Sequence, residues 1–269
     1  MNKNYALITG ASQGLGRSFA YEMASRKKNL ILVALANEGL VELAQTLIQK
    51  FKVDVVYFES NFVEPNAVEE LAQSVNEKFE IDVLINNAGL GGTASFSASS
   101  VNYIDAIIQV NIRALSLLIR LLLPNLKRQQ QAYILNVASM ASFTPIPYKT
   151  VYPASKAFVY FLSRTLNEEL RGTNVFVSVL HPGPMKTNQR VTRHIETQGW
   201  IGKMGLIPTD RLARLTIRQL YKRDSLIIPG FLNKINWLII KMVPIWLQLY
   251  LGARITRKEL EIENPVVSS

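Results

Sequence analysis

The stretch YALITGASQGLGR, residues 5–17, joins a short apolar run to a glycine-rich turn and a helix-like segment that continues to Arg26. A strand, a glycine turn and a helix in this order are typical of a dinucleotide-binding unit. Gly10 would permit the tight turn, Gly14 would let the backbone approach a pyrophosphate, and Gly16 would let helix and strand pack closely. The helix N-terminus would supply N–H donors and a positive dipole end. The spacing is G-x-x-x-G-x-G rather than G-x-G-x-x-G, so the assignment of a dinucleotide-binding turn needs a second motif to support it.

Support comes from the middle of the chain, where Ser139 is followed by Tyr152 after thirteen positions and by Lys156 after a further four. Tyrosine and lysine at i and i+4 share one face of a helix, which places an ammonium beside a phenol. A nearby cation lowers the pKa of a tyrosine from its usual value of about 10. Such a tyrosine can exchange a proton with a carbonyl or alcohol oxygen. An isolated pair of this kind is usually an exposed lysine near a half-buried tyrosine, so its weight depends on the glycine turn.

The two patterns in this order resemble the short-chain dehydrogenase/reductase family, whose members are single-domain NAD(P)-dependent oxidoreductases. Three further segments resemble motifs of the family. The first is NNAG at residues 86–89, which follows an apolar run. The second is Asn111, and the third is PGPMKT at residues 182–187. The resemblance extends from about Tyr5 to Thr187, and beyond Asn188 only general family character remains.

The resemblance implies a role for each residue of the candidate site. Tyr152 would be the general acid in reduction and the general base in oxidation, while Lys156 would lower its pKa and hydrogen-bond the nicotinamide ribose. Ser139 would hold and polarise the substrate carbonyl, and Asn111 would position a water that links Lys156 to solvent. The hydride belongs to the nicotinamide. The implied cofactor-binding residues are Gly10, Ser12, Gln13, Gly14, Leu15, Gly16, Asn61, Phe62, Asn87, Ala88, Gly89, Tyr152, Lys156, Pro182, Gly183 and Thr187, and no metal site is implied.

Length and composition predict a single α/β domain with a Rossmann-like, doubly wound parallel sheet of about seven strands. The chain has 269 residues, 48% of them hydrophobic, and no internal repeat or Gly/Ser linker. We expect a dinucleotide-binding and catalytic region at residues 1–230 and an apolar, basic C-terminal extension at residues 231–269. Apolar runs alternate with helix-like stretches, as a parallel sheet covered on both faces requires. The expected strands are Tyr5–Ile8, Leu30–Ala34, Val53–Glu59, Val83–Asn86, Tyr133–Val137, Phe176–Leu180 and Leu226–Pro229, and the helices between them include Asn37–Phe51, Ala67–Phe79, Asn102–Leu123 and Tyr152–Arg171.

The end of the second expected strand bears on the choice of cofactor. An acidic residue there would hold the ribose 2′-OH of NAD, and a basic one would favour the 2′-phosphate of NADP. Residues 32–37 read LVALAN and contain neither. Similar family members often carry arginine where Leu35 stands and a basic residue where Gln13 stands. The missing acid, the net charge of +10 and Arg17 favour NADP, with NAD as the alternative, although Arg17 could simply be an exposed helix residue. Asn61 stands where many members have an aspartate near the adenine, and its amide could still bond to the base.

Rare residue types narrow the chemistry further. The chain has no cysteine, which excludes disulfides and thiol catalysis and fits a cytoplasmic protein. Its two histidines, His181 and His194, lack the spacing of metal ligands, and a packing role is expected for His181. The first strand begins so near the N-terminus that no signal peptide is expected. The basic charge is dispersed and no recognition motif accompanies it, so nucleic acid is not an expected partner.

Residues 231–252 read FLNKINWLIIKMVPIWLQLYLG and are far more apolar than a solvated helix. Their polar residues fall mostly on one helical side, while the internal lysines and Pro244 disfavour a membrane span. Two alternatives remain: packing on the substrate cleft or a sister subunit, which we favour, and peripheral contact with a membrane surface. Residues 90–101 and 188–207 should flank the pocket, and 189–204 would form either a lid or a solvated surface loop.

Two functions from different classes fit the sequence. The favoured one is NADP-dependent hydride transfer to or from an apolar ketone or secondary alcohol, with an acyl chain or steroid-like skeleton, by a homo-oligomer (a dimer or tetramer). The alternative is a non-catalytic dinucleotide-binding regulatory or membrane-surface protein with the same fold. Ser139, Tyr152, Lys156 and Asn111 together argue against the alternative, because dinucleotide binding alone needs no serine–tyrosine pair.

Overall fold

Seven parallel strands form one sheet in the computed structural model, which describes residues 4–183 and 206–263. The strand order is β3-β2-β1-β4-β5-β6-β7, so the chain builds outward from β1 in one direction and, from β4 onward, in the other. This is the doubly wound, Rossmann-like arrangement expected from the sequence, and its switch point lies between β1 and β4. The strands are β1 Asn4–Thr9, β2 Asn29–Ala34, β3 Val55–Glu59, β4 Glu80–Asn86, β5 Ala132–Val137, β6 Val175–Leu180 and β7 Leu226–Ile227.

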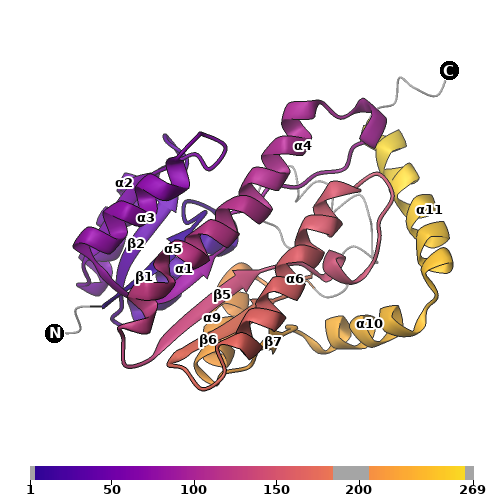
Figure 1. Cartoon of the computed structure of the whole chain (residues 1–269). Coiled ribbons are helices and arrows are strands. Elements are labelled where there is room, and N and C mark those ends of the chain that lie inside the picture. The colour runs from indigo at the N-terminus through magenta and orange to yellow at the C-terminus, as the bar shows by residue number, and fades with distance from the viewer. Residues whose placement is uncertain (1–3, 184–205, 264–269) are drawn as a thin grey trace.

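Helices cover both faces of this sheet (Figure 1). Parallel neighbours require crossover connections, and the helices supply them. Two further helices, α10 and α11, form an arm at one side of the molecule, beyond the last strand. The helical elements are α1 Gly14–Ser25, α2 Leu40–Phe51, α3 Ala67–Lys78, the short turn η1 Phe96–Ala98, α4 Val101–Ile108, the π-helical segment η2 Gln109–Ala114, α5 Leu115–Lys127, the short turn η3 Met140–Phe143, α6 Val151–Glu169, α9 Thr209–Tyr221, α10 Phe231–Met242 and α11 Ile245–Glu263.

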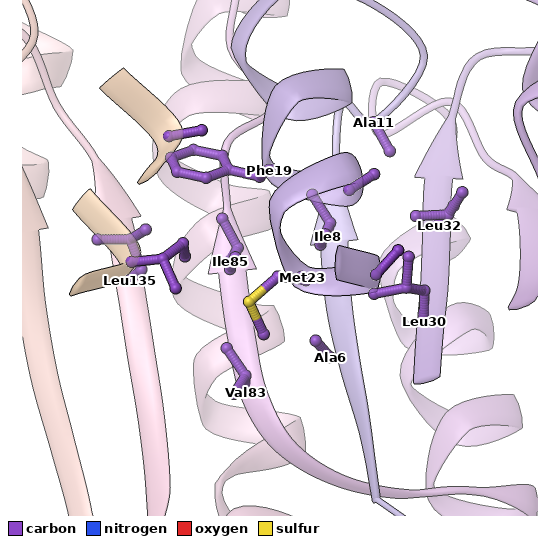
Figure 2. Packing of buried hydrophobic residues seen from close by; sticks show 14 of the residues in the cluster. Ala6, Ile8, Ala11, Phe19, Met23, Leu30, Leu32, Val83, Ile85 and Leu135 are labelled. Carbon is purple, nitrogen blue, oxygen red and sulfur yellow. The ribbon is translucent and has the colours of Figure 1, made fainter. Parts of the chain in front are cut away.

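One face of the sheet packs under α1, α2 and α9. Phe19 and Met23 of α1 lie over Ile8, Ile85 and Leu135 of three adjacent strands, and all five side chains are fully buried (Figure 2). Burial of each such side chain contributes about 1.5–3 kcal/mol. This packing holds the start of α1 close to the carboxyl ends of β1 and β4.

The other face packs under α3, α5 and α6. Leu7 lies between two residues that face α1, so its side chain points to this second layer. The continuous helical run Val101–Lys127 is long and apolar enough to cross a membrane by length and composition. Its Leu118 and Leu122 are buried in the second layer of the core, so in this fold the run is a core helix.

Two helical elements differ from the expectation. The sequence TDRLARLTIRQLY of α9 is rich in charge and was not expected to be helical, but its Leu212, Ile217 and Leu220 are buried on the face shared with α1. The expected helix at 102–123 runs from Val101 to Lys127 and is interrupted by η2. The π turn depends on packing and has no local signal, whereas the apolar spacing of α9 is a local amphipathic pattern that the sequence reasoning overlooked.

The apolar stretch after Gly230 forms two helices joined by a corner. α10 ends at Met242 and α11 begins at Ile245. Pro244 lies between them, and proline lacks the N–H that would continue a helix. The side-chain amide of Gln248 donates to the carbonyls of Ile240 at 2.9 Å and Val243 at 2.7 Å, so a side chain of the second helix caps the end of the first.

Candidate active site

The glycine turn between β1 and α1 is held by close contacts that exclude side chains. Gly10 has a φ of +62°, and a Cβ there would lie 2.9 Å from the Asn87 side-chain nitrogen. A Cβ at Gly16 would lie 2.0 Å from the Gly10 carbonyl oxygen, so only glycine lets α1 approach the turn this closely. α1 begins at Gly14, and the Gln13 side chain before it does not cap the helix. The turn and uncapped helix start therefore fit a dinucleotide pyrophosphate.

Thr9 and Asn87 join this turn to the end of β4. The Thr9 hydroxyl accepts from the backbone N–H groups of Asn87 and Ala88, both at 3.0 Å. The Asn87 side chain donates to the carbonyls of Thr9 at 3.0 Å and Gly10 at 3.1 Å. The sequence reasoning singled out Asn87 and Ala88 but missed Thr9, which precedes Gly10 and resembles an ordinary strand-end residue.

Asn111 is buried in the π-helical segment η2, where it clamps the loop that follows β4. Its Oδ1 accepts from the Leu90 N–H at 2.8 Å, and its Nδ2 donates to the Leu90 carbonyl at 2.8 Å and to the Ser155 hydroxyl at 2.9 Å. The π turn carries this amide to both partners. The sequence reasoning assigned no role to Ser155, whose place three residues after Tyr152 on α6 was the available signal.

Gly89 lies where Asn111 and Lys156 converge. A Cβ at Gly89 would lie 3.1 Å from Lys156 Nζ and 3.3 Å from Asn111 Oδ1. The absence of a side chain therefore keeps room for a small group beside both polar atoms. Gly91 makes a similar approach to the ring of Tyr152, because a Cβ there would lie 2.6 Å from its Cδ2.

Ser139, Tyr152 and Lys156 come together at the carboxyl end of β5, as expected. Ser139 caps η3, accepting from the Ala141 N–H at 3.1 Å, and its side chain also hydrogen-bonds Tyr152. Lys156 Nζ donates to the Val137 carbonyl at 2.9 Å and lies 5.9 Å from the centre of the Tyr152 ring. Two adjacent turns of α6 thus present the phenol and the ammonium to the end of one strand.

Burial moves the pKa values of these groups in ways that the sequence reasoning did not anticipate. The pKa of Tyr152 is raised by burial, and its hydrogen bond with Ser139 only partly opposes the shift. The pKa of Lys156 is lowered to about 8, because burial penalises its charged form. In the protein alone, desolvation thus outweighs the expected lowering of the tyrosine pKa by the neighbouring ammonium.

His181 supports the turn that carries Ser139. The imidazole is fully buried, stacks on Phe143 with ring centres 4.3 Å apart, and places Nδ1 3.0 Å from the Ser139 carbonyl and 2.8 Å from the Ser142 hydroxyl. Burial, more than any other cause, lowers the pKa of His181 to about 4. A neutral, packed imidazole matches the packing role expected for it.

The surroundings of the second strand contain an acid that the sequence reasoning did not weigh. The Glu38 carboxylate accepts from the Ser12 hydroxyl at 2.5 Å, although no acid occurs at residues 34–37. Arg17 is exposed and lies over the Tyr21 ring at 5.9 Å, as an ordinary exposed helix residue would. Negative charge is therefore present at the glycine turn.

The remaining expected cofactor residues divide into three groups. Leu15 and Phe62 are buried core residues, and Asn61 bonds locally, with its Nδ2 3.1 Å from a Glu64 carboxylate oxygen. Pro182 and Gly183 follow β6, and a Cβ at Gly183 would meet the Asn233 side chain of α10 at 2.9 Å. Thr187, His194 and the expected lid at 189–204 lie outside the described residues.

A cavity opens beside Tyr152, between the loop after β4 and the start of α6. Gly92, Ala94, Phe96 and Ser99, from the stretch 90–101 that was expected to flank the substrate pocket, line one side of it. Its walls combine apolar side chains with tyrosines. The lining residues are Gly92, Ala94, Phe96, Ser99, Tyr103, Ile104, Ile107, Tyr148, Lys149, Thr150, Val151 and Tyr152.

Comparison with known proteins places this site in a family. The short chain dehydrogenase family matches residues 4–197. The very-long-chain 3-oxoacyl-CoA reductase of Rattus norvegicus is 30% identical over 182 residues, which are 66% of this chain and 58% of the relative. The chain thus spans little more than half the length of such curated relatives.

Solved structures match over more of the chain. The bulky-bulky ketone specific alcohol dehydrogenase from Comamonas testosteroni is 27% identical, with a TM-score of 0.78 over 90% of this chain and 92% of that one. A short-chain dehydrogenase from Sphingobium yanoikuyae in complex with NADPH is also 27% identical, with a TM-score of 0.78 over 88% and 92% of the two chains. Another matching structure holds NAD. The fold, the glycine turn and the extent of the family match agree, and the chain belongs to the short-chain dehydrogenase/reductase family.

Proposed function

We propose that this chain is an NADP(H)-dependent oxidoreductase that transfers hydride between the nicotinamide and an apolar ketone or secondary alcohol. The observation that carries the proposal is the convergence of Ser139, Tyr152, Lys156 and Asn111 at the carboxyl end of β5, beside a glycine turn. A protein that only binds a dinucleotide has no need for a serine hydroxyl bonded to a tyrosine. Residues 1–230 would form the catalytic region and 231–269 the extension.

The side chains divide the proposed chemistry among them. The bound nicotinamide would supply or accept the hydride. In reduction, Ser139 would hold the ketone oxygen and Tyr152 would donate a proton to it, and in oxidation Tyr152 would take that proton back. The raised pKa of Tyr152 keeps the phenol protonated at neutral pH, which suits a proton donor. The Lys156 ammonium would stabilise the phenolate that remains after the proton has moved.

Asn111 would help return the proton to Tyr152 from solvent. Both of its amide N–H groups are committed to Leu90 and Ser155, but Oδ1 keeps a second lone pair. The space above Gly89 borders both this oxygen and Lys156 Nζ. A water there would connect the lysine to Asn111, as the proposed relay requires.

NADP(H) remains the proposed cofactor, with NAD(H) as the alternative. Leu35 and the residues on either side of it offer no carboxylate to a ribose 2′-OH. The turn is tied to this strand end by the Ala11 N–H, which donates to the Val33 carbonyl at 3.1 Å. A bound 2′-phosphate would require Glu38 to turn away from Ser12, so this carboxylate is expected to weaken NADPH binding.

An apolar substrate is proposed chiefly from the relatives, because the cavity beside Tyr152, although Phe96, Ile104 and Ile107 line it, has a volume of only about 20 Å³. Two relatives, a very-long-chain 3-oxoacyl-CoA reductase and a bulky-bulky ketone specific alcohol dehydrogenase, support this class by their names. A cytoplasmic location, a homo-oligomeric assembly and the absence of a nucleic-acid partner remain predictions from the sequence.

The proposal is tested by replacing Tyr152 with phenylalanine and following NADPH absorbance with ketones of graded chain length. Tyr152→Phe should lower kcat by about a hundredfold or more, the usual worth of general acid–base help, and should leave the NADPH dissociation constant nearly unchanged. Lys156→Ala should harm both, since the lysine is also expected to grip the ribose. Retention of more than about a tenth of the activity by Tyr152→Phe would contradict the assignment. Dinucleotide binding without turnover on any ketone or alcohol would favour the non-catalytic alternative.

A further inference from the structure

α10 packs on the domain through one narrow face. Asn233 is buried and donates to the Pro229 carbonyl at 2.7 Å, while Trp237 meets Phe143 edge-on with ring centres 6.2 Å apart. Ile240, one turn further on, is half-buried. The spacing of these three residues places them on one side of the helix. This inner face lies against η3, the turn that Ser139 caps.

The opposite side of α10 is apolar and faces away from the protein. Phe231, Ile235, Leu238 and Met242 follow one another at helical spacing, about half a turn from the inner face. Phe231 is 76% exposed, Leu238 54% and Met242 85%. A helix on the surface of a soluble domain normally directs its apolar stripe inward and its charges outward. We call these four residues the outer stripe.

α11 extends this exposed apolar surface. Ile245 and Trp246, at its start, are 64% and 70% exposed, and Tyr250 follows one turn later. Gln248 caps α10, so the two helices share a fixed corner. A Cβ at Gly252 would lie 3.3 Å from Pro147, which shows that α11 also packs on the loop before α6. The arm at the side of the molecule (Figure 1) therefore contacts the rest of the protein through α10 and through the middle of α11.

The charged residues of α10 and of the first two-thirds of α11 are all positive, while the glutamates of α11 come later, at positions 259, 261 and 263. Residues 231–257 contain Lys234, Lys241, Arg254 and Arg257, and no aspartate or glutamate. Lys241 lies over the Trp237 ring at 4.1 Å, and Arg254 lies over the Tyr250 ring at 5.2 Å. Two of the cations in this segment thus lie against aromatic rings.

A groove beside Phe231 adds two cations, Arg218 and Lys222, and one acid, Asp224, to Lys234. It lies between α9 and the start of α10 and contains three cations and one acid. Oxygen atoms of an anionic headgroup would find lysine and arginine donors there. The groove is lined by Leu215, Arg218, Gln219, Lys222, Asp224, Ile228, Pro229, Gly230, Phe231 and Lys234.

We propose that the outer stripe and the start of α11 dock this protein on an anionic lipid surface. A second copy of the chain is a poorer occupant, because a two-fold interface would bring this basic surface against itself. In an anionic bilayer, the acyl chains would bury the apolar side chains and the negative headgroups would attract the lysines and arginines. Tryptophan and tyrosine at the border suit the headgroup level. Docking through the outer stripe would place α10 between the lipid and the η3 turn, so the candidate active site would lie about one helix diameter from the lipid.

Flotation of the full chain with vesicles tests the proposal. Vesicles of phosphatidylcholine alone are compared with vesicles that also contain phosphatidylserine, at low and high salt. The protein is expected to float with the anionic vesicles at low salt and to be released as salt rises. The double variant Leu238→Gln/Met242→Gln should bind at least about tenfold less, because it removes two large apolar side chains from the lipid contact. Lys234→Gln/Lys241→Gln should weaken the dependence on phosphatidylserine.

Ile48→Gln is the matched control, since Ile48 is an exposed apolar residue on α2, at the far end of the molecule in Figure 1. It should float as the wild type does, and all variants should keep their dinucleotide affinity, which shows that they are folded. Failure of the wild type to float, or equal flotation of Leu238→Gln/Met242→Gln, would overturn the proposal. A wild-type dimer that does not float, and that this double variant converts to a monomer, would assign the outer stripe to a subunit interface instead. None of these outcomes depends on turnover, so they stand apart from the proposed function.

Discussion

Tyr152 and Lys156 have pKa values that burial moves apart. Tyr152 stays protonated to high pH, while the pKa of Lys156 is lowered to about 8. If reduction needs the charged lysine, kcat/KM measured with limiting NADPH should fall as pH rises through about 8, by about tenfold per pH unit. With limiting NADPH, the pH dependence of kcat/KM reports the ionisation of groups in the enzyme before the cofactor binds, which is the state to which the lowered pKa of Lys156 applies.

Lys156→Arg separates the lysine from other causes of this decline. A guanidinium stays protonated throughout the range, so any residual activity should lose the decline near pH 8, whatever its absolute level. If kcat/KM of Lys156→Arg still fell near pH 8, a group other than Lys156 would control the decline.

Glu38 and Leu35 control the charge near the expected 2′-position. Leu35→Arg should tighten NADPH binding by about tenfold, because a guanidinium forms charge-assisted hydrogen bonds with phosphate, and Leu35→Asp should shift preference toward NADH. Glu38→Gln should also tighten NADPH binding, since it removes the carboxylate that lies at Ser12. Titration of both cofactors against each variant measures these changes.

Glu77→Gln is the control for Glu38→Gln, because it removes one negative charge from α3 instead. It should leave the affinities for NADPH and NADH unaltered. If Leu35→Asp still preferred NADPH, the 2′-position would lie elsewhere than at the end of β2.

At the scale of elements, the loop after β4 packs directly on the ring of Tyr152. Gly91 touches the Tyr152 ring so closely that a Cβ would lie 2.6 Å from it. Gly91→Ala should therefore displace the ring or the loop and lower kcat by about tenfold or more, as a small misplacement of a reacting group does. Its effect on NADPH affinity should be much smaller.

Gly252→Ala is a control for a tight contact that does not involve the Tyr152 ring, because its Cβ would lie 3.3 Å from Pro147. Unchanged kcat in Gly91→Ala would mean that the tyrosine ring adapts without cost and that the loop does not position it.

For the whole molecule, the buried His181 links stability to acidity. Its folded pKa of about 4 lies below the ordinary value of 6.5, so the unfolded chain binds the additional proton between these values. Stability is therefore fully present above about pH 6.5 and is lost as pH falls toward 4, by about 3 kcal/mol. Urea unfolding at a series of pH values measures this slope.

His181→Asn should be less stable at pH 7 and should show a shallower loss of stability on acidification. The carboxylates titrate in both proteins, so the difference between the two slopes isolates the histidine. Parallel slopes would place the acid sensitivity in other groups.

Local spacing was enough to predict much of the site. The i, i+4 relation of Tyr152 and Lys156 holds because both lie on α6, whose geometry determines which side chains share a face. The alternation of apolar runs and helices likewise indicated the parallel sheet, since its central strands are buried on both faces. The π turn at Asn111 was not evident, because it depends on packing with distant segments. The amphipathic pattern of α9 was present in the sequence and was overlooked.

The sequence by itself therefore determined the class of fold, the glycine turn and the helix that carries the tyrosine and lysine, because these depend on neighbours along one element. Only the tertiary structure brought Ser139 to Tyr152, attached Asn111 to Leu90 and Ser155, and placed Glu38 beside Ser12. It also decided which side of α10 faces outward. Such contacts join segments far apart in the chain, and desolvation, which shifts the pKa values of the site, exists only once those segments have packed.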